Sequence, residues 1–195
     1  MEKQKSYEIL ESLPSSGPLY ISVTENNENY VSEGFPVRFF RDNGTSWVAN
    51  FKTGWTNFSQ VYDIENQTHL VVIAGGTLYI MNPENEKPLD VYGVGFEKAI
   101  KSEQDQIILQ DQTNLTIIEK NGEYWITERL SFDGIKELTV TGNVVSGLAY
   151  FPTSDDDLWL DFTLNLENRK ITGESFKEIE FIEIKKKWWK FWQTT

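Results

Sequence analysis

The sequence has no cysteine and only one histidine, His69, among its 195 residues. Without cysteine the chain has no disulfides, no thiolate zinc ligands and no cysteine nucleophile. A lone histidine also falls short of a zinc site, whose ligands are chiefly cysteine and histidine. We interpret His69 as a structural or solvent-exposed residue at the entrance to the apolar run 70–74. We predict no metal and no cofactor.

Long apolar runs and phosphate-binding loops are also missing. No run approaches the roughly 18 apolar residues that cross a bilayer. The first eight residues are largely polar, whereas a secretory signal has a basic start and then an apolar stretch, so we expect a cytoplasmic protein. Gly93-Val94-Gly95 begins like a dinucleotide loop, but Lys98 stands where a third glycine is needed. We interpret these glycines as a bend between strands.

Positive charge is scarce outside the C-terminus. The chain has 18 basic and 30 acidic residues, which gives a net charge of −12 at pH 7. Four of the basic residues are lysines of the run 185–192, which leaves 14 basic residues and a net charge of −16 for the rest. Such a field repels nucleic-acid phosphates. We expect no nucleic-acid partner, and an acidic surface that either maintains solubility or favours a basic partner.

Short runs of aliphatic and aromatic residues alternate with turn sequences over most of the chain, and this alternation predicts strands. The expected strands are 19–24, 36–41, 46–52, 60–64, 70–74, 77–82, 89–92, 96–101, 106–110, 115–119, 124–128, 135–141, 144–151, 158–164, 170–173 and 176–184. Asp42-Asn43-Gly44, Gly75-Gly76, Asn121-Gly122 and Gly142-Asn143 mark tight reversals, because asparagine and glycine tolerate a positive φ. The connections are too short for helical crossovers, so we expect mostly antiparallel pairing.

These elements predict an all-β fold of antiparallel hairpins. A turn followed by an alternating strand recurs so that Leu78, Leu115 and Leu158 lie 37 and then 43 residues apart, close to the length of a four-stranded propeller blade. Blade-like sheets of a small or partial β-propeller and a β-sandwich both stay open. The length fits a single domain, 1–195, with its β region at 19–184.

Short helices are expected at both ends. Tyr7, Leu10 and Leu13 have helical spacing before Pro14, which predicts a helix and connection within 1–18. The tail 185–195 carries four aromatic residues that fall on one side of a helix, with lysines opposite: Trp188, Trp189, Phe191 and Trp192. So short a helix must dock on something. Its own acidic body, a membrane interface and a protein partner are the alternatives, and the net charge disfavours an anionic membrane.

The densest acidic cluster is Asp155-Asp156-Asp157, which is followed by Trp159. Consecutive side chains of a strand point to opposite faces, so we do not expect these carboxylates to converge on one ion. The spacing of a calcium loop is also missing. A solvated turn is the simplest interpretation, and a partner contact is the functional alternative.

The last third of the chain resembles a group of uncharacterised bacterial all-β proteins. The matching segments are Ser131-Phe132-Asp133-Gly134-Ile135, Gly147-Leu148-Ala149-Tyr150, and Trp159 with Phe162-Thr163-Leu164 and Ile171-Thr172-Gly173-Glu174-Ser175-Phe176. The ending Trp188-Trp189-Lys190-Phe191-Trp192 is similar to endings of small bacterial proteins, some of them immunity proteins of toxin systems. The resemblance implies a bacterial origin. It transfers no functional residue, because the group has no assigned activity.

We therefore predict a non-enzymatic protein-interaction module, of which an immunity-type inhibitor that captures a basic toxin domain is the most specific form. Its candidate contact residues are Asp155, Asp156, Asp157 and Trp159. The first alternative is a carbohydrate-binding or glycoside-acting protein, because four tryptophans lie among many carboxylates: Trp47, Trp55, Trp125 and Trp159. The second alternative is a peripheral membrane protein that uses the tail.

Overall fold

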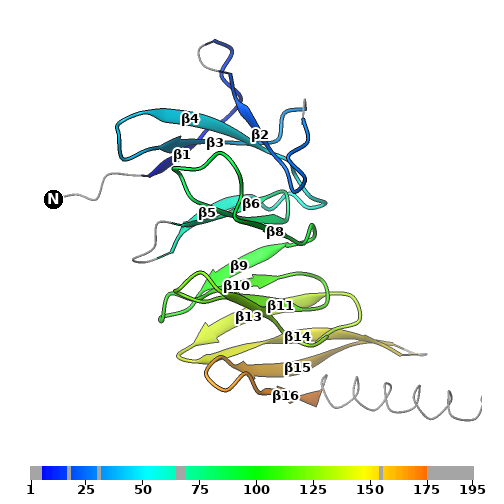
Figure 1. Ribbon diagram of the computed structural model, residues 1–195. Helices are drawn as coiled ribbons and strands as arrows, with labels where there is room; N and C mark the ends of the chain where they lie inside the picture. The colour runs from blue at the N-terminus through cyan, green and yellow to red at the C-terminus, as the bar shows by residue number, and fades with distance from the viewer. Residues whose placement is uncertain (1–5, 17–18, 30–31, 65–68, 154–155, 175–195) are drawn as a thin grey trace, which may run out of the picture. The chain divides into compact units, whose positions relative to one another are not determined.

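The structure, a computed structural model, describes residues 6–16, 19–29, 32–64, 69–153 and 156–174. These residues form sixteen β-strands in four four-stranded sheets (Figure 1). The chain divides into two compact units, residues 1–97 with 120–122 and residues 98–119 with 123–195. The all-β fold is thereby confirmed. That the chain forms a single domain stays a prediction, and the C-terminal helix predicted at 185–195 lies outside the described residues.

The first sheet belongs to the first unit and contains β1 (Tyr7–Ile9), β2 (Ile21–Val23), β3 (Phe35–Phe40) and β4 (Ser46–Phe51). Its order is β1-β3-β4-β2, and β2 runs parallel to β4. This is the one parallel pair among the described strands, so the expectation of mostly antiparallel pairing is confirmed. Strand β3 lies between β2 and β4 in sequence and runs in the opposite direction. It returns the chain so that β2 and β4 can be parallel, a connection for which other sheets usually use a helix.

The predicted N-terminal helix is wrong, because residues 7–9 form strand β1. Tyr7 pairs with Phe39 of β3, and the backbone N–H of Leu10 donates to the carbonyl of Pro36 at 3.0 Å. The tyrosine ring packs against the core of the first unit. A helix of two turns is unstable alone in water, whereas the edge of a sheet offers immediate backbone partners.

The other three sheets are antiparallel meanders in which each strand pairs with the next. The second sheet contains β5 (Gln60–Asp63), β6 (Leu70–Ala74), β7 (Thr77–Met81) and β8 (Asp90–Tyr92). The third contains β9 (Lys98–Lys101), β10 (Ile107–Gln110), β11 (Leu115–Ile118) and β12 (Tyr124–Ile126). The fourth contains β13 (Ile135–Thr141), β14 (Val144–Pro152), β15 (Asp157–Asn165) and β16 (Ile171–Gly173). Four-stranded meanders are the blade-like arrangement that the repeat predicts.

The repeated turn-and-strand sequence has a structural counterpart. Leu78, Leu115 and Leu158 lie on β7, β11 and β15, which are the third strands of the second, third and fourth sheets. The Gly75-Gly76 reversal joins β6 to β7, and Gly76 has a φ of 87°, which only glycine adopts easily. The sequence repeat therefore marks the third strand of three successive sheets.

Each unit has its own hydrophobic core. In the first unit the core lies between the first two sheets and contains aromatic rings in tilted contact, with centroids 5.0 Å apart for Phe39 and Trp47 and also for Phe51 and Tyr79. In the second unit the core joins the third and fourth sheets, where Ile117 and Phe162 are fully buried. The amide of Gln110 crosses this core and donates to the carbonyl of Ile135 at 2.8 Å.

Candidate functional site

Strand β15 carries most of the predicted contact residues that the structure describes. Asp156 closes the β14–β15 turn, because its backbone N–H donates to Thr153 Oγ1 at 2.9 Å and its carbonyl accepts from the same hydroxyl. Asp157 and Trp159 follow on β15 and are exposed. Asp155 lies outside the described residues, as do the tail residues Trp188, Trp189, Phe191 and Trp192.

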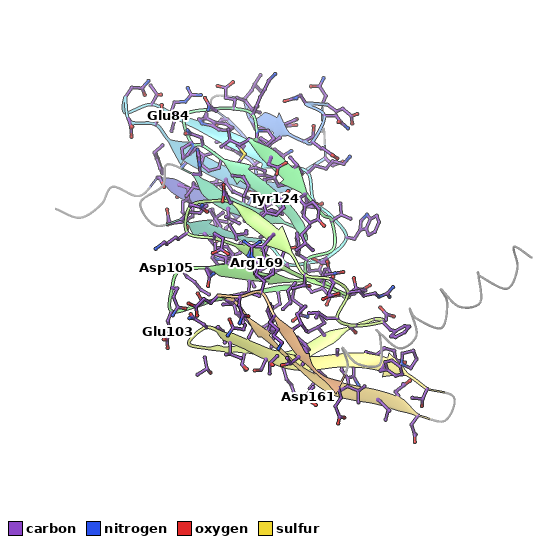
Figure 2. The ribbon with its side chains drawn as sticks, turned by 60° about the horizontal axis from the view of Figure 1, so that its bottom comes forward. Glu84, Glu103, Asp105, Tyr124, Asp161 and Arg169 are labelled. Atoms are coloured by element: carbon purple, nitrogen blue, oxygen red, sulfur yellow. The ribbon has the colours of Figure 1, made fainter. Side chains whose placement is uncertain are left out.

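Alternation along β15 sends Trp159 outward. Phe162 and Leu164 are fully buried in the core of the second unit, so residues of the opposite parity, including Trp159 and Asp161, lie on the outer face. Figure 2 labels Asp161 on this strand. The predicted acidic cluster is thereby divided, because Asp156 belongs to the turn and Asp157 shares a face with Trp159.

Two side chains and a glycine surround the indole of Trp159. Tyr150 is its cross-strand partner on β14, with ring centroids 5.5 Å apart and an interplanar angle of 58°. Lys136 of β13 places its Nζ 3.9 Å from the centre of the indole. A Cβ at Gly134 would lie 3.3 Å from Trp159 Cη2, so the glycine gives the ring its space. The indole is still 36% exposed.

Carboxylates surround this aromatic pair. The hydroxyl of Tyr150 donates to Asp157 Oδ1 at 2.6 Å. This hydrogen bond, with smaller contributions from burial and from the charges of Asp157 and Asp133, raises the pKa of Tyr150 above its ordinary value of 10.0. We call the outward residues Lys136, Tyr150, Asp157, Trp159 and Asp161 the aromatic face. Lys136, Tyr150 and Asp161 are not among the residues predicted from the sequence, and only Asp161 has a local signal there, its alternation with Trp159.

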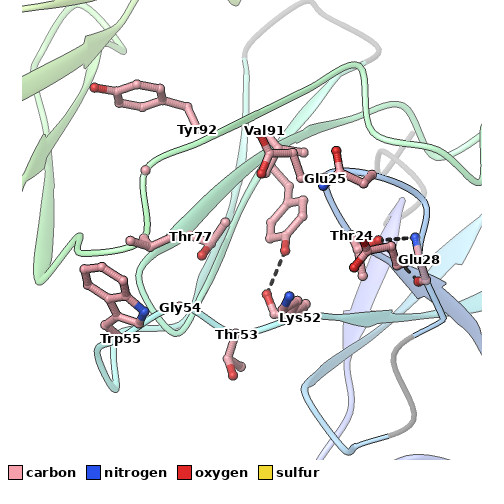
Figure 3. A pocket seen from close by; sticks show the side chains of 14 residues that line it. Thr24, Glu25, Glu28, Lys52, Thr53, Gly54, Trp55, Thr77, Val91 and Tyr92 are labelled. Carbon is pink, nitrogen blue, oxygen red and sulfur yellow. Dashed lines mark hydrogen bonds between the residues drawn. The ribbon is translucent and has the colours of Figure 1, made fainter.

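A second feature lies in the first unit, where the described residues line a cavity of about 320 Å³. Its lining comes from the β2–β3 turn, the segment after β4, strand β7 and the end of β8: Thr24, Glu25, Asn26, Glu28, Lys52, Thr53, Gly54, Trp55, Thr77, Tyr79, Val91, Tyr92, Gly93 and Val94. Figure 3 shows Trp55 on one side and Glu25 and Glu28 on the other. The side chain of Trp55 is 86% exposed, the most exposed tryptophan among the described residues.

The structure also places the histidine and the two other tryptophans that were candidates in the sequence. His69 is half-buried and directly precedes β6, as predicted. Trp47 is buried, and Trp125 lies beneath the guanidinium of Arg169. Within the described ranges, no group of three or more His, Cys, Asp or Glu residues is placed to hold a metal ion. In the part of the chain that the structure describes, no helix is long and apolar enough to cross a bilayer.

Comparison with known proteins leaves the activity open. No family model and no curated protein matches the chain. Among solved structures, the chain is similar to one titled "Crystal structure of the tricorn protease", with 14% sequence identity and a TM-score of 0.43. The match covers 89% of this chain and 18% of that chain. A likeness of this degree assigns no activity to this protein.

Proposed function

We propose that the protein is a non-catalytic interaction module that binds a protein partner through the aromatic face. The observation that supports the proposal is the indole of Trp159, which is partly exposed yet fixed by Tyr150 and Lys136. Large aromatic side chains dominate the binding energy of protein interfaces. One that is already ordered loses little conformational entropy when a partner covers it.

The charges around the indole define the partner's chemistry. Asp133, Asp156, Asp157 and Asp161 are all exposed on the loop and strands that carry the aromatic face. The chain as a whole has a net charge of −12. A partner that brings lysine or arginine side chains around an apolar group would complement this surface and be steered toward it. A basic toxin domain held by an immunity-type inhibitor fits this description, in the cytoplasm of a bacterium.

The experiment is co-purification from the native host with four versions of the chain. They are the wild type, Trp159→Ala, Asp156→Lys, and Glu128→Lys as a charge-matched control on an exposed residue of the same unit. We expect a basic protein that is retained by the wild type and the control, released by added salt, and lost from the other two variants. Thermal unfolding of each variant verifies that the fold is intact.

Two results would contradict the proposal. One is that no protein is specifically retained by the wild type. The other is a partner that binds Trp159→Ala and Asp156→Lys as tightly as it binds the control, since the contact would then lie elsewhere on the chain.

A further inference from the structure

The cavity of the first unit shares no residue with the aromatic face, and Trp55 lies at one side of it (Figure 3). The backbone of this residue is fixed, because its N–H donates to the carbonyl of Val94 at 2.7 Å. The preceding residue, Gly54, donates to the carbonyl of Ala74 at 3.0 Å. The loop therefore fixes the backbone from which an almost fully exposed indole projects, and the side chains of its own unit leave this indole largely uncovered.

Gly54 shows how tightly this loop is packed. A Cβ at this position would lie 2.6 Å from Thr77 Oγ1 and 2.7 Å from the carbonyl oxygen of Gly75, closer than such atoms approach. Thr56 completes the packing, since its N–H donates to the carbonyl of Gly75 at 2.9 Å and its hydroxyl to that of Phe96 at 2.6 Å. The exposure of Trp55 is thus not a consequence of a loose loop.

The opposite side of the cavity is polar and is formed by a hydrogen-bonded turn. Thr24 is buried and closes the β2–β3 turn, because its Oγ1 accepts the N–H of Glu28 at 2.8 Å. The turn presents Glu25, Asn26 and Glu28, which are all exposed. Tyr79 is buried beneath, and its hydroxyl donates to the carbonyl of Lys52 at 2.7 Å. The cavity therefore combines one flat apolar surface with several hydrogen-bonding groups.

We propose that this cavity binds a neutral saccharide. The C–H-rich face of a sugar ring would stack on the indole of Trp55, and its hydroxyls would donate to the carboxylates of Glu25 and Glu28. A small number of polar groups beside an apolar surface is typical of ligand sites, and the volume lies at the low end of their range of roughly 300–1,000 Å³. This size suits a mono- or disaccharide. Phosphorylated ligands are disfavoured because the two glutamates outnumber the one basic residue of the lining, Lys52, and because the net charge of the chain repels anions.

The experiment follows the indole N–H signals of the ¹⁵N-labelled full chain by NMR. The probes are cellobiose, maltose, xylobiose and N,N′-diacetylchitobiose, each titrated into the millimolar range. The Trp55 signal is assigned by its absence from Trp55→Ala. We expect at least one disaccharide to shift this signal saturably. Glu28→Gln should weaken the binding by about fivefold or more, the size of a lost hydrogen bond to a charged group.

Trp159→Ala is the matched control, because it removes a second exposed indole outside the cavity. Its affinity for the sugar should equal that of the wild type, whereas the affinity of Trp55→Ala should be at least tenfold lower. Since the Trp55 side chain is 86% exposed, its removal leaves the core unchanged. The proposal is overturned if none of the four disaccharides shifts the Trp55 signal, or if Trp55→Ala still binds the sugar as tightly. Neither result bears on protein binding at the aromatic face.

Discussion

The guanidinium of Arg169 lies over the indole of Trp125, with its Cζ 4.8 Å from the ring centroid. Trp125 belongs to β12 of the third sheet, and Arg169 lies in the β15–β16 turn of the fourth, so the contact joins the two sheets of the second unit. The indole N–H donates to Glu119 Oε1 at 2.7 Å, and Gln106 Nε2 donates to Glu119 Oε2 at 2.8 Å. The guanidinium of Arg169, the indole of Trp125 and the carboxylate of Glu119 are thus linked in series.

Arg169 adopts a φ of 58°, which is unfavourable for a residue other than glycine by about 1 kcal/mol. Arg169→Ala loses the cation–π contact and keeps the unfavourable φ, so we expect the free energy of unfolding to fall by about 1 kcal/mol. Arg169→Gly also loses the contact but relieves the backbone, so its stability should lie between those of Arg169→Ala and the wild type. Urea denaturation compares the three. An alanine variant as stable as the wild type would show that the contact contributes nothing.

Gly54 has no space for a side chain. We expect Gly54→Ala to lower the free energy of unfolding by about 2–3 kcal/mol, because the new methyl group would overlap with Thr77 and Gly75. Gly95→Ala is the control, since a Cβ there meets no atom within 4 Å. Its effect should stay within about 0.5 kcal/mol. Equal effects of the two substitutions in denaturant unfolding would contradict the tight packing of the Trp55 loop.

The hydrogen bond from Tyr150 to Asp157 makes a prediction about pH. The pKa of Tyr150 is raised in the folded state, chiefly because the neutral hydroxyl donates to this carboxylate. The stabilising contribution is therefore fully present below the ordinary pKa of about 10 and is lost as the pH rises through the raised value. Asp157→Asn should move the pKa of Tyr150 back toward 10. The ¹³Cζ shifts of labelled tyrosines, with Tyr150→Phe for assignment, measure this pKa, and an unchanged value in Asp157→Asn would refute the explanation.

Strand β1 offers two adjacent residues with different expected effects. Glu8 accepts a hydrogen bond from Arg38 at 2.6 Å, but both side chains are partly exposed. Glu8→Ala should therefore lower the free energy of unfolding by no more than about 1 kcal/mol. Tyr7 packs on the core and donates its hydroxyl to the carbonyl of Val61 at 3.3 Å, so Tyr7→Ala should lower it by about 2 kcal/mol or more. Thermal unfolding compares the stabilities of the two variants. If Glu8→Ala were less stable than Tyr7→Ala, the result would argue against β1 as a packed strand.

The strands could be predicted from the sequence because alternation and turn residues act locally. The expected segments 70–74 and 135–141 coincide with β6 and β13, and 46–52 differs from β4 by one residue. Local spacing also explains the failure at residues 7–13. A few apolar residues at helical spacing do not distinguish a short helix from an edge strand. Residues 7–9 form a strand because the edge of β3 offers them backbone hydrogen-bond partners.

The candidate sites were less predictable because they depend on pairing between distant segments. The parity of β15 is visible in the sequence and places Asp157, Trp159 and Asp161 on one face. The contact of Trp159 with Lys136 depends on the register of three strands and on the irregularity between Lys136 and Thr139 in β13. The cavity beside Trp55 combines four segments between residues 24 and 94, and no local pattern brings them together.

The parallel pairing of β2 with β4 has a consequence for synthesis on the ribosome. Residues 21–23 emerge before β3 and β4, yet their hydrogen-bonding neighbour in the sheet is β4. In a nascent chain that ends before residue 46, β2 therefore has no neighbouring strand with which it can form its native hydrogen bonds. Strand β2, at the edge of the first sheet, is therefore synthesised early but can join the sheet only after β4 has been made.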